Sequence, residues 1–238
     1  MSQQAPNTPF RSGWYSFDLG QYRPCNSTYC YYPYEGLPPL PATAHTDSLD
    51  WLGPLDEHLD QEMEVHRPPA EQRSDLEQRA QALGEQAQQL GLTLPVTFLP
   101  FMASSELQDR IPSCTACTFG LPQQIVKCPG SENGYVIRFL NDQQDVLLWY
   151  LYLTPAGDHC VIVAPYEFYE LAEEPEQAAT YNDEQRKAIL DNTFVCSPSF
   201  GEFLYRFWLE NSIWFALNDG TPLTADQQQY VSHYATAK

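Results

Sequence analysis

Basic residues are scarce in this chain. Its 238 residues hold 12 lysines and arginines against 31 aspartates and glutamates, which gives a formal net charge of −19. A field of that sign repels nucleic-acid phosphate and anionic membranes, and it draws cationic partners inward. The sequence therefore argues against nucleic-acid binding and favours another protein as the partner.

Long apolar runs are also missing. No window approaches the roughly 18 apolar residues that a membrane span requires, and the segment Met1–Pro9 has neither the basic start nor the apolar run of an export signal. The seven cysteines are an odd number in a chain without such a signal. These absences predict a cytoplasmic protein with reduced thiols and no membrane contact.

Catalytic signatures are absent as well. The chain contains no HExxH, GxSxG, P-loop or GxGxxG motif. The run Asp158-His159-Cys160 offers triad-like residue types, but neighbours on a strand point to opposite faces, so His159 and Cys160 cannot pair there. We therefore expect no enzymatic activity and no cofactor.

Three cysteines form the one pattern that suggests a metal. Cys114 and Cys117 form a CxxC pair, and Cys128 follows eleven residues later. A structural zinc site needs four ligands, usually as two close pairs, and the second pair is incomplete here. Either the three are weak zinc candidates or they are small apolar residues near a core, and the spacing favours the core.

The clearest structural signal lies between residues 135 and 163. Val146–Leu153 is apolar at every position, which is typical of a central strand covered on both faces. Tyr135–Leu140 and Cys160–Val163 are predicted to be its neighbours, each joined to it by a polar turn. Arg138 interrupts the first strand, and a half-buried arginine must be paired, so Asp142 and Asp145 are its candidate partners.

Apolar spacings of three and four predict helices around this sheet. In one of them Leu76, Ala80, Leu83 and Ala87 repeat ahead of Gly91, a suitable C-cap. In the strongest, Ser199 and Glu202 fit a capping box ahead of an aromatic face. The remaining predicted helices are Leu49–Leu59, Pro95–Gln108, Glu184–Asp191 and Thr224–Ala237.

The first 68 residues read as an irregular arm. Half of the 20 prolines fall before Ala70, and the segment has many tyrosines with little periodicity. Disordered segments are poor in aromatics, so this arm is expected to lie on its own domain or on a partner, with its own domain favoured. The predicted organisation is an acidic Pro/Tyr-rich arm over 1–68 and one domain over 69–238.

Three passages resemble the SUKH superfamily, which includes bacterial immunity proteins and the yeast cell-wall assembly regulator linked to killer-toxin resistance. They are Leu90–Phe101 with its Gly-x-x-Leu-Pro helix end, Ile137–Leu153, and Ser197–Leu217. The family core has a short acidic, glycine-rich element where this chain carries Ile111–Gly130. The resemblance implies an α+β module that binds proteins, often a cognate toxin, without catalysis.

Taken together, the residues and the resemblance predict an α+β domain with a mainly antiparallel sheet of about five or six strands flanked by helices. The expected function is non-catalytic protein binding, as a bacterial immunity protein that occludes a basic toxin. The alternative is a scaffold subunit whose arm threads along a larger complex. No oligomeric state is predicted. The candidate partner-binding residues are acidic: Asp142, Asp145, Asp158, Glu167, Glu170, Glu173 and Glu174.

Overall fold

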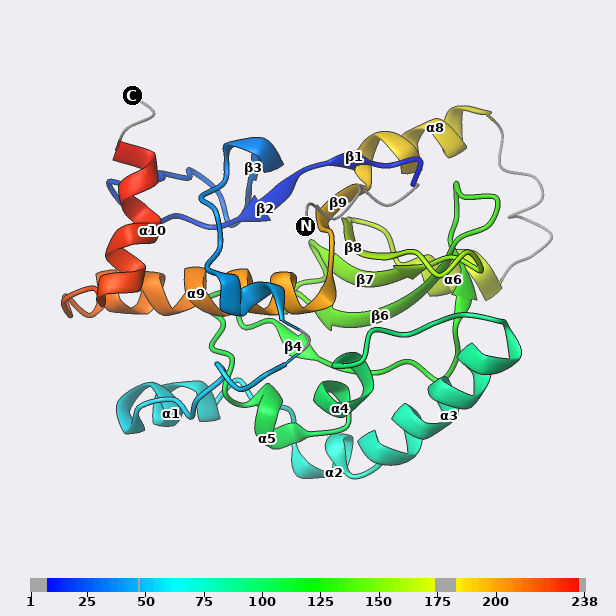
Figure 1. The fold of residues 1–238 in the computed structure, drawn as a ribbon, viewed down its shortest axis with the longest axis horizontal. Coiled ribbons are helices and arrows are strands. Elements are labelled where there is room, and N and C mark those ends of the chain that lie inside the picture. Colours follow the sequence, from blue (N-terminus) through cyan, green and yellow to red (C-terminus); the bar gives the residue numbers. More distant parts are fainter. Residues whose placement is uncertain (1–7, 47, 174–182, 236–238) are drawn as a thin grey trace.

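The computed structural model describes residues 8–46, 48–173 and 183–235, which form an α+β protein around one main sheet (Figure 1). Over these described residues the sheet has seven strands in the order β1-β9-β8-β7-β6-β4, with β5 also paired to β6. Every pairing is antiparallel except β1 with β9. The strands are β1 Arg11–Ser12, β4 Thr118–Phe119, β5 Val126–Lys127, β6 Tyr135–Asn141, β7 Leu148–Leu153, β8 His159–Ala164 and β9 Phe194–Ser197.

The central strand is β7, and the predicted strand trio is confirmed. All six of its residues are buried, and alternate side chains enter two different clusters. Trp149 lies in the cluster on one face, whereas Tyr150 lies in the cluster on the other. A strand covered on both faces has no need for polar residues, which explains its unbroken apolar sequence. Val146, predicted to belong to this strand, is instead 46% exposed in the preceding turn.

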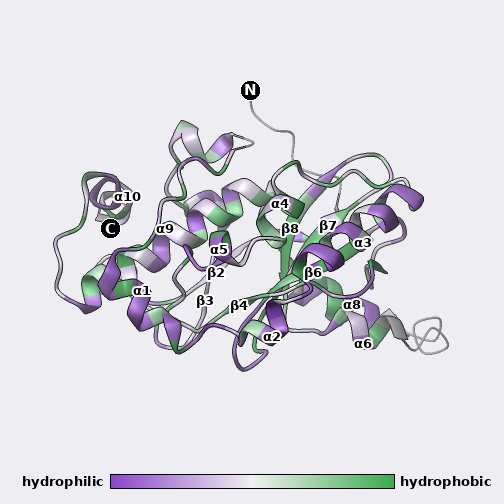
Figure 2. Cartoon of the chain, turned by 90° about the horizontal axis from the view of Figure 1, so that it is seen from below, coloured by the Kyte–Doolittle hydropathy of each residue, from purple (hydrophilic) through white to green (hydrophobic). Residues whose placement is uncertain are grey.

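Helices cover both faces of the sheet. On one face Phe200 packs edge-on against Phe98, Phe101 and Phe139, and Figure 2 shows the apolar colour concentrated on the strands between the helices. On the other face Phe168 stacks on Tyr150. The helices are α1 Glu57–Glu64, α2 Ala70–Arg73, α3 Leu76–Gln89, α4 Phe98–Met102, α5 Ser105–Gln108, α6 Phe168–Glu173, α8 Asp183–Asn192, α9 Phe200–Asn218 and α10 Ala225–Ala235.

Most predicted helices are confirmed, with two corrections. Ser199 caps α9 by accepting a hydrogen bond from the backbone N–H of Glu202, and Gly91 adopts a positive φ of 69° after α3. The helix expected over Leu49–Leu59 begins only at Glu57, where the Asp56 side chain caps it. The single helix expected over Pro95–Gln108 is two short helices, because Ser104 adopts an extended conformation and caps the second.

The arm is built into the core of the domain. Its strands β2 (Trp14–Ser16) and β3 (Cys30–Tyr32) form a separate hairpin-like pair, and its 3-10 turns span Tyr34–Gly36 and Ala42–His45. Trp14, Leu37 and Leu52 belong to the same buried cluster as the face of the sheet under α9. The docking of the arm on its own domain is therefore confirmed for the described residues, and packing continues across the predicted boundary at 68/69.

Cys25 and Cys30 form a disulfide in the arm, which corrects the expectation that all thiols are reduced. The bond closes a short loop just before β3. The other five cysteines, Cys114, Cys117, Cys128, Cys160 and Cys196, are free. Among the described helices, none combines the length and the apolar character that crossing a bilayer would need.

Opening this disulfide should have a measurable cost. We expect Cys25→Ser to lower the free energy of unfolding by about 2 kcal/mol, because a six-residue loop is no longer closed in the unfolded chain. Denaturant titration with and without reductant measures the effect, and the variant should be insensitive to reductant. Seven alkylatable thiols in the unfolded, unreduced wild-type protein would contradict the bond.

Candidate functional site

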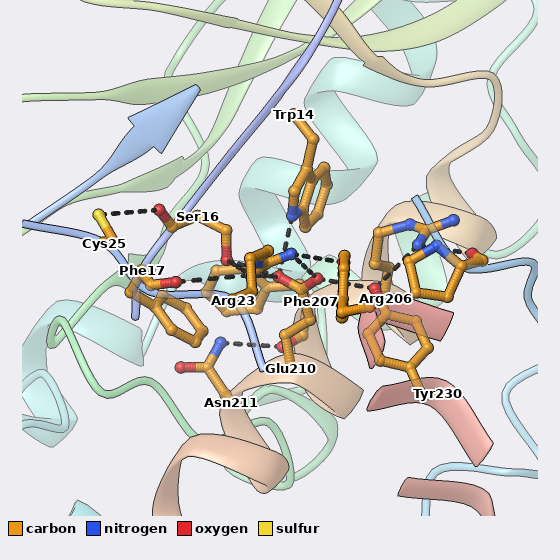
Figure 3. A network of polar contacts seen from close by, with 12 residues as sticks. Trp14, Ser16, Phe17, Arg23, Cys25, Arg206, Phe207, Glu210, Asn211 and Tyr230 are labelled. Carbon is orange, nitrogen blue, oxygen red and sulfur yellow. Dashed lines mark hydrogen bonds and ion pairs between the residues drawn. The ribbon is translucent and has the colours of Figure 1, made fainter. Parts of the chain in front are cut away.

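Five hydrogen bonds converge on one buried carboxylate, Glu210 of α9 (Figure 3). Its Oε1 accepts from Arg23 Nη1 at 2.6 Å and from the Tyr230 hydroxyl at 2.7 Å. Its Oε2 accepts from the Trp14 indole at 2.9 Å, from Arg23 Nη2 at 2.8 Å and from the Ser16 hydroxyl. The carboxylate has no lone pair left for a ligand, so the network holds the arm to α9 and α10 and is not itself a binding site.

The electrostatics of this network follow from its burial. Burial alone would raise the pKa of Glu210, but the charge of Arg23 and the hydrogen bonds from Arg23, Ser16 and Tyr230 lower it to about 2. Burial also disfavours the charged form of Arg23, yet Glu210 outweighs it and raises the pKa of the guanidinium. Glu210 and Arg23 are therefore an ionised pair at neutral pH.

The cysteine pattern does not assemble into a metal site. Cys128 packs with Cys160 in the cluster on one face of the sheet, whereas Cys117 lies against the cluster on the opposite face. Burial raises the pKa of Cys114, Cys117 and Cys128, which disfavours the thiolate that metals and electrophiles require. Their role as small apolar residues is the one that these positions support. Within the described residues, the one group of potential ligands in metal-binding reach is His58, Glu62 and Asp219.

The candidate partner-binding acids lie at two ends of the sheet. Asp145 follows β6, where the β6–β7 turn lies, and Asp158 lies in the β7–β8 turn at the opposite end, since the strands are antiparallel. Asp145 and Asp158 are exposed, as is Glu170 on α6. Of Glu173 only the backbone is described, at the end of α6, and Glu174 lies outside the described residues.

Two of the candidate acids, Asp142 and Glu167, already bond to other residues of the protein. Asp142 is only 4% exposed: it accepts a hydrogen bond from the Tyr29 hydroxyl at 2.6 Å and others from backbone N–H groups of its own turn. Glu167 pairs with Arg138, so the prediction that Asp142 or Asp145 would be the partner of Arg138 is wrong. Arg138 lies on the face of the sheet that α6 covers, which brings the start of α6 into its reach.

Asp158 borders a surface hollow of about 630 Å³, which we call the hairpin hollow. It lies between the β7–β8 turn and the turn before β6, and none of the described residues lining it is lysine or arginine. Glu132 and Asp158 are its exposed acids, one on each side. A hollow with two acids and no base suits a cationic side chain.

The hairpin hollow has a rigid wall and an unused polar atom. Ser131 Oγ lies 2.8 Å from the Tyr152 hydroxyl and accepts from the Gly134 N–H at 3.0 Å. A Cβ at Gly134 would lie 2.2 Å from the Tyr152 ring, so only glycine fits there. Thr154, 7% exposed, also lines the hollow, and its hydroxyl has no hydrogen-bond partner among the described residues. That hydroxyl is itself buried and so lies behind the surface of the hollow.

The sequence analysis did not identify Glu132 as a residue of the candidate binding site. The pairing of Tyr135 with Leu153 places the start of β6 beside the end of β7, and therefore places both turns at one end of the sheet. The turn residues Asn133-Gly134 and the adjacent acid were visible in the sequence. What was missing was the register that brings Glu132 and Asp158 to the same hollow.

Comparison with known proteins returned no match to a family model, to a curated protein or to a solved structure. The fold and the hollow thus define an acidic α+β protein with a candidate site for a cationic group.

Proposed function

We propose that this chain is a non-catalytic protein-binding module of SUKH type, acting as an immunity protein that neutralises a cognate toxin by occlusion. The observation that carries the proposal is the hairpin hollow, where Glu132 and Asp158 offer two carboxylates with no lysine or arginine among the described lining residues. A lysine or arginine of a basic partner would enter it, and the net charge of −19 would speed the encounter.

The packing of the three SUKH-like passages supports this proposal. Phe98 and Phe101 come from the first passage, Phe139 from the second and Phe200 from the third, and their rings meet in one aromatic cluster. Residues that define a family through their sequence order are expected to meet in its core.

The proposed location is the cytoplasm, and the Cys25–Cys30 disulfide is the feature that points to a more oxidising compartment.

The scaffold alternative requires an arm that is free to bind along a larger complex. Among the described residues, the arm instead contributes Trp14, Leu37 and Leu52 to the core of the domain, which leaves less of it to thread along a complex. Immunity is therefore the function we favour.

Charge reversal at the hairpin hollow tests the proposal. We expect Glu132→Lys combined with Asp158→Lys to abolish capture of a basic partner from the native cell, because the hollow would then repel a cationic side chain. Glu64→Lys, which changes an exposed acid of α1 that does not line the hollow, is the matched control and should retain capture.

Two measurements check that outcome. Affinity capture with mass spectrometry compares the three proteins, and co-expression with the captured protein measures protection of growth. Loss of both capture and protection in the double variant alone supports immunity through the hollow. An identical set of captured proteins for the double variant and the wild type would remove the hollow from the proposal.

A further inference from the structure

Three potential metal ligands meet where α1, in the arm, lies beside the C-terminal end of α9. His58 and Glu62 are four residues apart on α1, so they share one face of that helix. Asp219 is the C-cap of α9. The ligand atoms of the three side chains all lie within 4.8 Å of one another, and all three residues are exposed. This close approach joins two segments that are about 160 positions apart in the sequence.

These side chains are not used within the described part of the chain. The side chains of His58 and Glu62 have no hydrogen-bond or ion-pair partner among the described residues. The Asp219 carboxylate accepts one hydrogen bond, from Asn218 Nδ2 at 3.3 Å. Two carboxylates this close repel each other unless a positive charge lies between them. No lysine or arginine belongs to the group, and a cation bound beside the His58 ring would relieve that repulsion.

The surroundings favour a cation. His58 and Asp219 line a hollow of about 630 Å³ whose other acids are Asp56 and Asp226, and none of its described lining residues is lysine or arginine. Asp219 also terminates α9, where the unpaired carbonyls of the last turn give the helix a partial negative charge. Both the acids of the hollow and the carbonyls at the end of α9 therefore present negative charge to an incoming metal ion.

We propose that His58, Glu62 and Asp219 bind a divalent transition-metal ion, and that Zn²⁺ fits this donor set best. An imidazole nitrogen with two carboxylate oxygens suits zinc, whereas Ca²⁺ and Mg²⁺ prefer oxygen ligands alone. Three protein ligands leave a fourth tetrahedral position open toward the hollow. The bound ion links α1 to the end of α9 and thereby fixes the acidic part of the arm on the domain.

Calorimetric titration with zinc chloride, without reductant so that the Cys25–Cys30 disulfide stays closed, tests the site. We expect the full-length chain to bind one zinc ion, and we expect His58→Gln, Glu62→Gln and Asp219→Asn each to weaken binding by about tenfold or more. Glu57→Gln removes a neighbouring exposed acid of α1 and should bind zinc as the wild type does. Zinc should also raise the melting temperature of the wild type and of this control.

Cobalt substitution separates this site from the free cysteines. Co²⁺ bound by nitrogen and oxygen should show visible d–d absorption without a thiolate charge-transfer band, and the absorption should be lost in His58→Gln. A thiolate band, zinc binding by His58→Gln equal to the wild type, or no saturable binding of zinc at all would each overturn the proposal. These outcomes are independent of the hairpin hollow, whose variants keep all three ligands.

Discussion

Glu210→Gln is expected to lower the free energy of unfolding by about 3–5 kcal/mol, the usual cost of breaking a buried ion pair by removing one charge. Glu210 is fully buried, and Arg23 is only 3% exposed. The glutamine would turn an N–H₂ group toward donors and would leave the guanidinium without its counter-charge. Chemical denaturation of the variant and the wild type measures the difference.

Two controls show whether the effect belongs to the buried pair. Glu106→Gln removes a carboxylate that pairs with Arg110 at the surface, with the glutamate side chain 78% exposed, and should cost less than about 1 kcal/mol. Replacing both members, as Arg23→Met with Glu210→Leu, should recover only part of the loss, because Trp14, Ser16 and Tyr230 then lose their acceptor. A Glu210→Gln protein as stable as the wild type would show that the pair contributes nothing.

The pH dependence of stability gives an independent reading of the same pair. The pKa of Glu210 is lowered from 4.5 to about 2 in the folded protein. Its ionised form therefore stabilises the fold above pH 4.5, and this contribution is lost as the pH falls from 4.5 toward 2. We expect the stability difference between wild type and Glu210→Gln to shrink over that interval. A difference that stays constant would contradict the lowered pKa.

Removing residues 1–55 is expected to abolish cooperative folding. The deleted segment holds Trp14, Phe17, Leu19, Leu37 and Leu52, all buried. At roughly 1.5–3 kcal/mol for each buried side chain, their loss is on the order of 10 kcal/mol, which matches the whole stability of a typical domain. Near-ultraviolet circular dichroism and thermal melting of the truncated chain measure the outcome.

Val65→Ser in the full-length chain is the control for this truncation. Val65 also precedes residue 69 but is 80% exposed, so its replacement should leave the melting temperature unchanged. A truncated chain that stays soluble and melts cooperatively would mean that the arm is dispensable. That result would return support to the scaffold alternative, in which the arm acts on another molecule.

Where a prediction depended on short-range pattern, the structure agrees with it. The apolar run before Leu153 became a strand buried on both faces, and Ser199 caps its helix as its spacing to Glu202 predicts. The predicted helix bounds were wrong where a capping side chain interrupted the apolar pattern. Ser104 divides the expected Pro95–Gln108 helix because its side chain caps a new turn.

The candidate sites were harder to predict, because each depends on residues that are distant in the sequence. Arg138 was expected to pair with an acid of the following turn, but Glu167, the residue just before α6, pairs with it instead. Asp142 was expected at a binding surface, but Tyr29 of the arm covers it. In both cases the expectation rested on residues close in the sequence. Folding of the chain instead brought a distant residue into contact.

Composition and periodicity were sufficient for the α+β class, the three central strands and the main helices, because hydrogen bonds and burial patterns there repeat over a few residues. Tertiary structure alone decided that Arg23 meets Glu210, that Glu132 and Asp158 share a hollow, and that His58 lies beside Asp219. Such contacts depend on how whole elements pack, and no spacing along the chain encodes them.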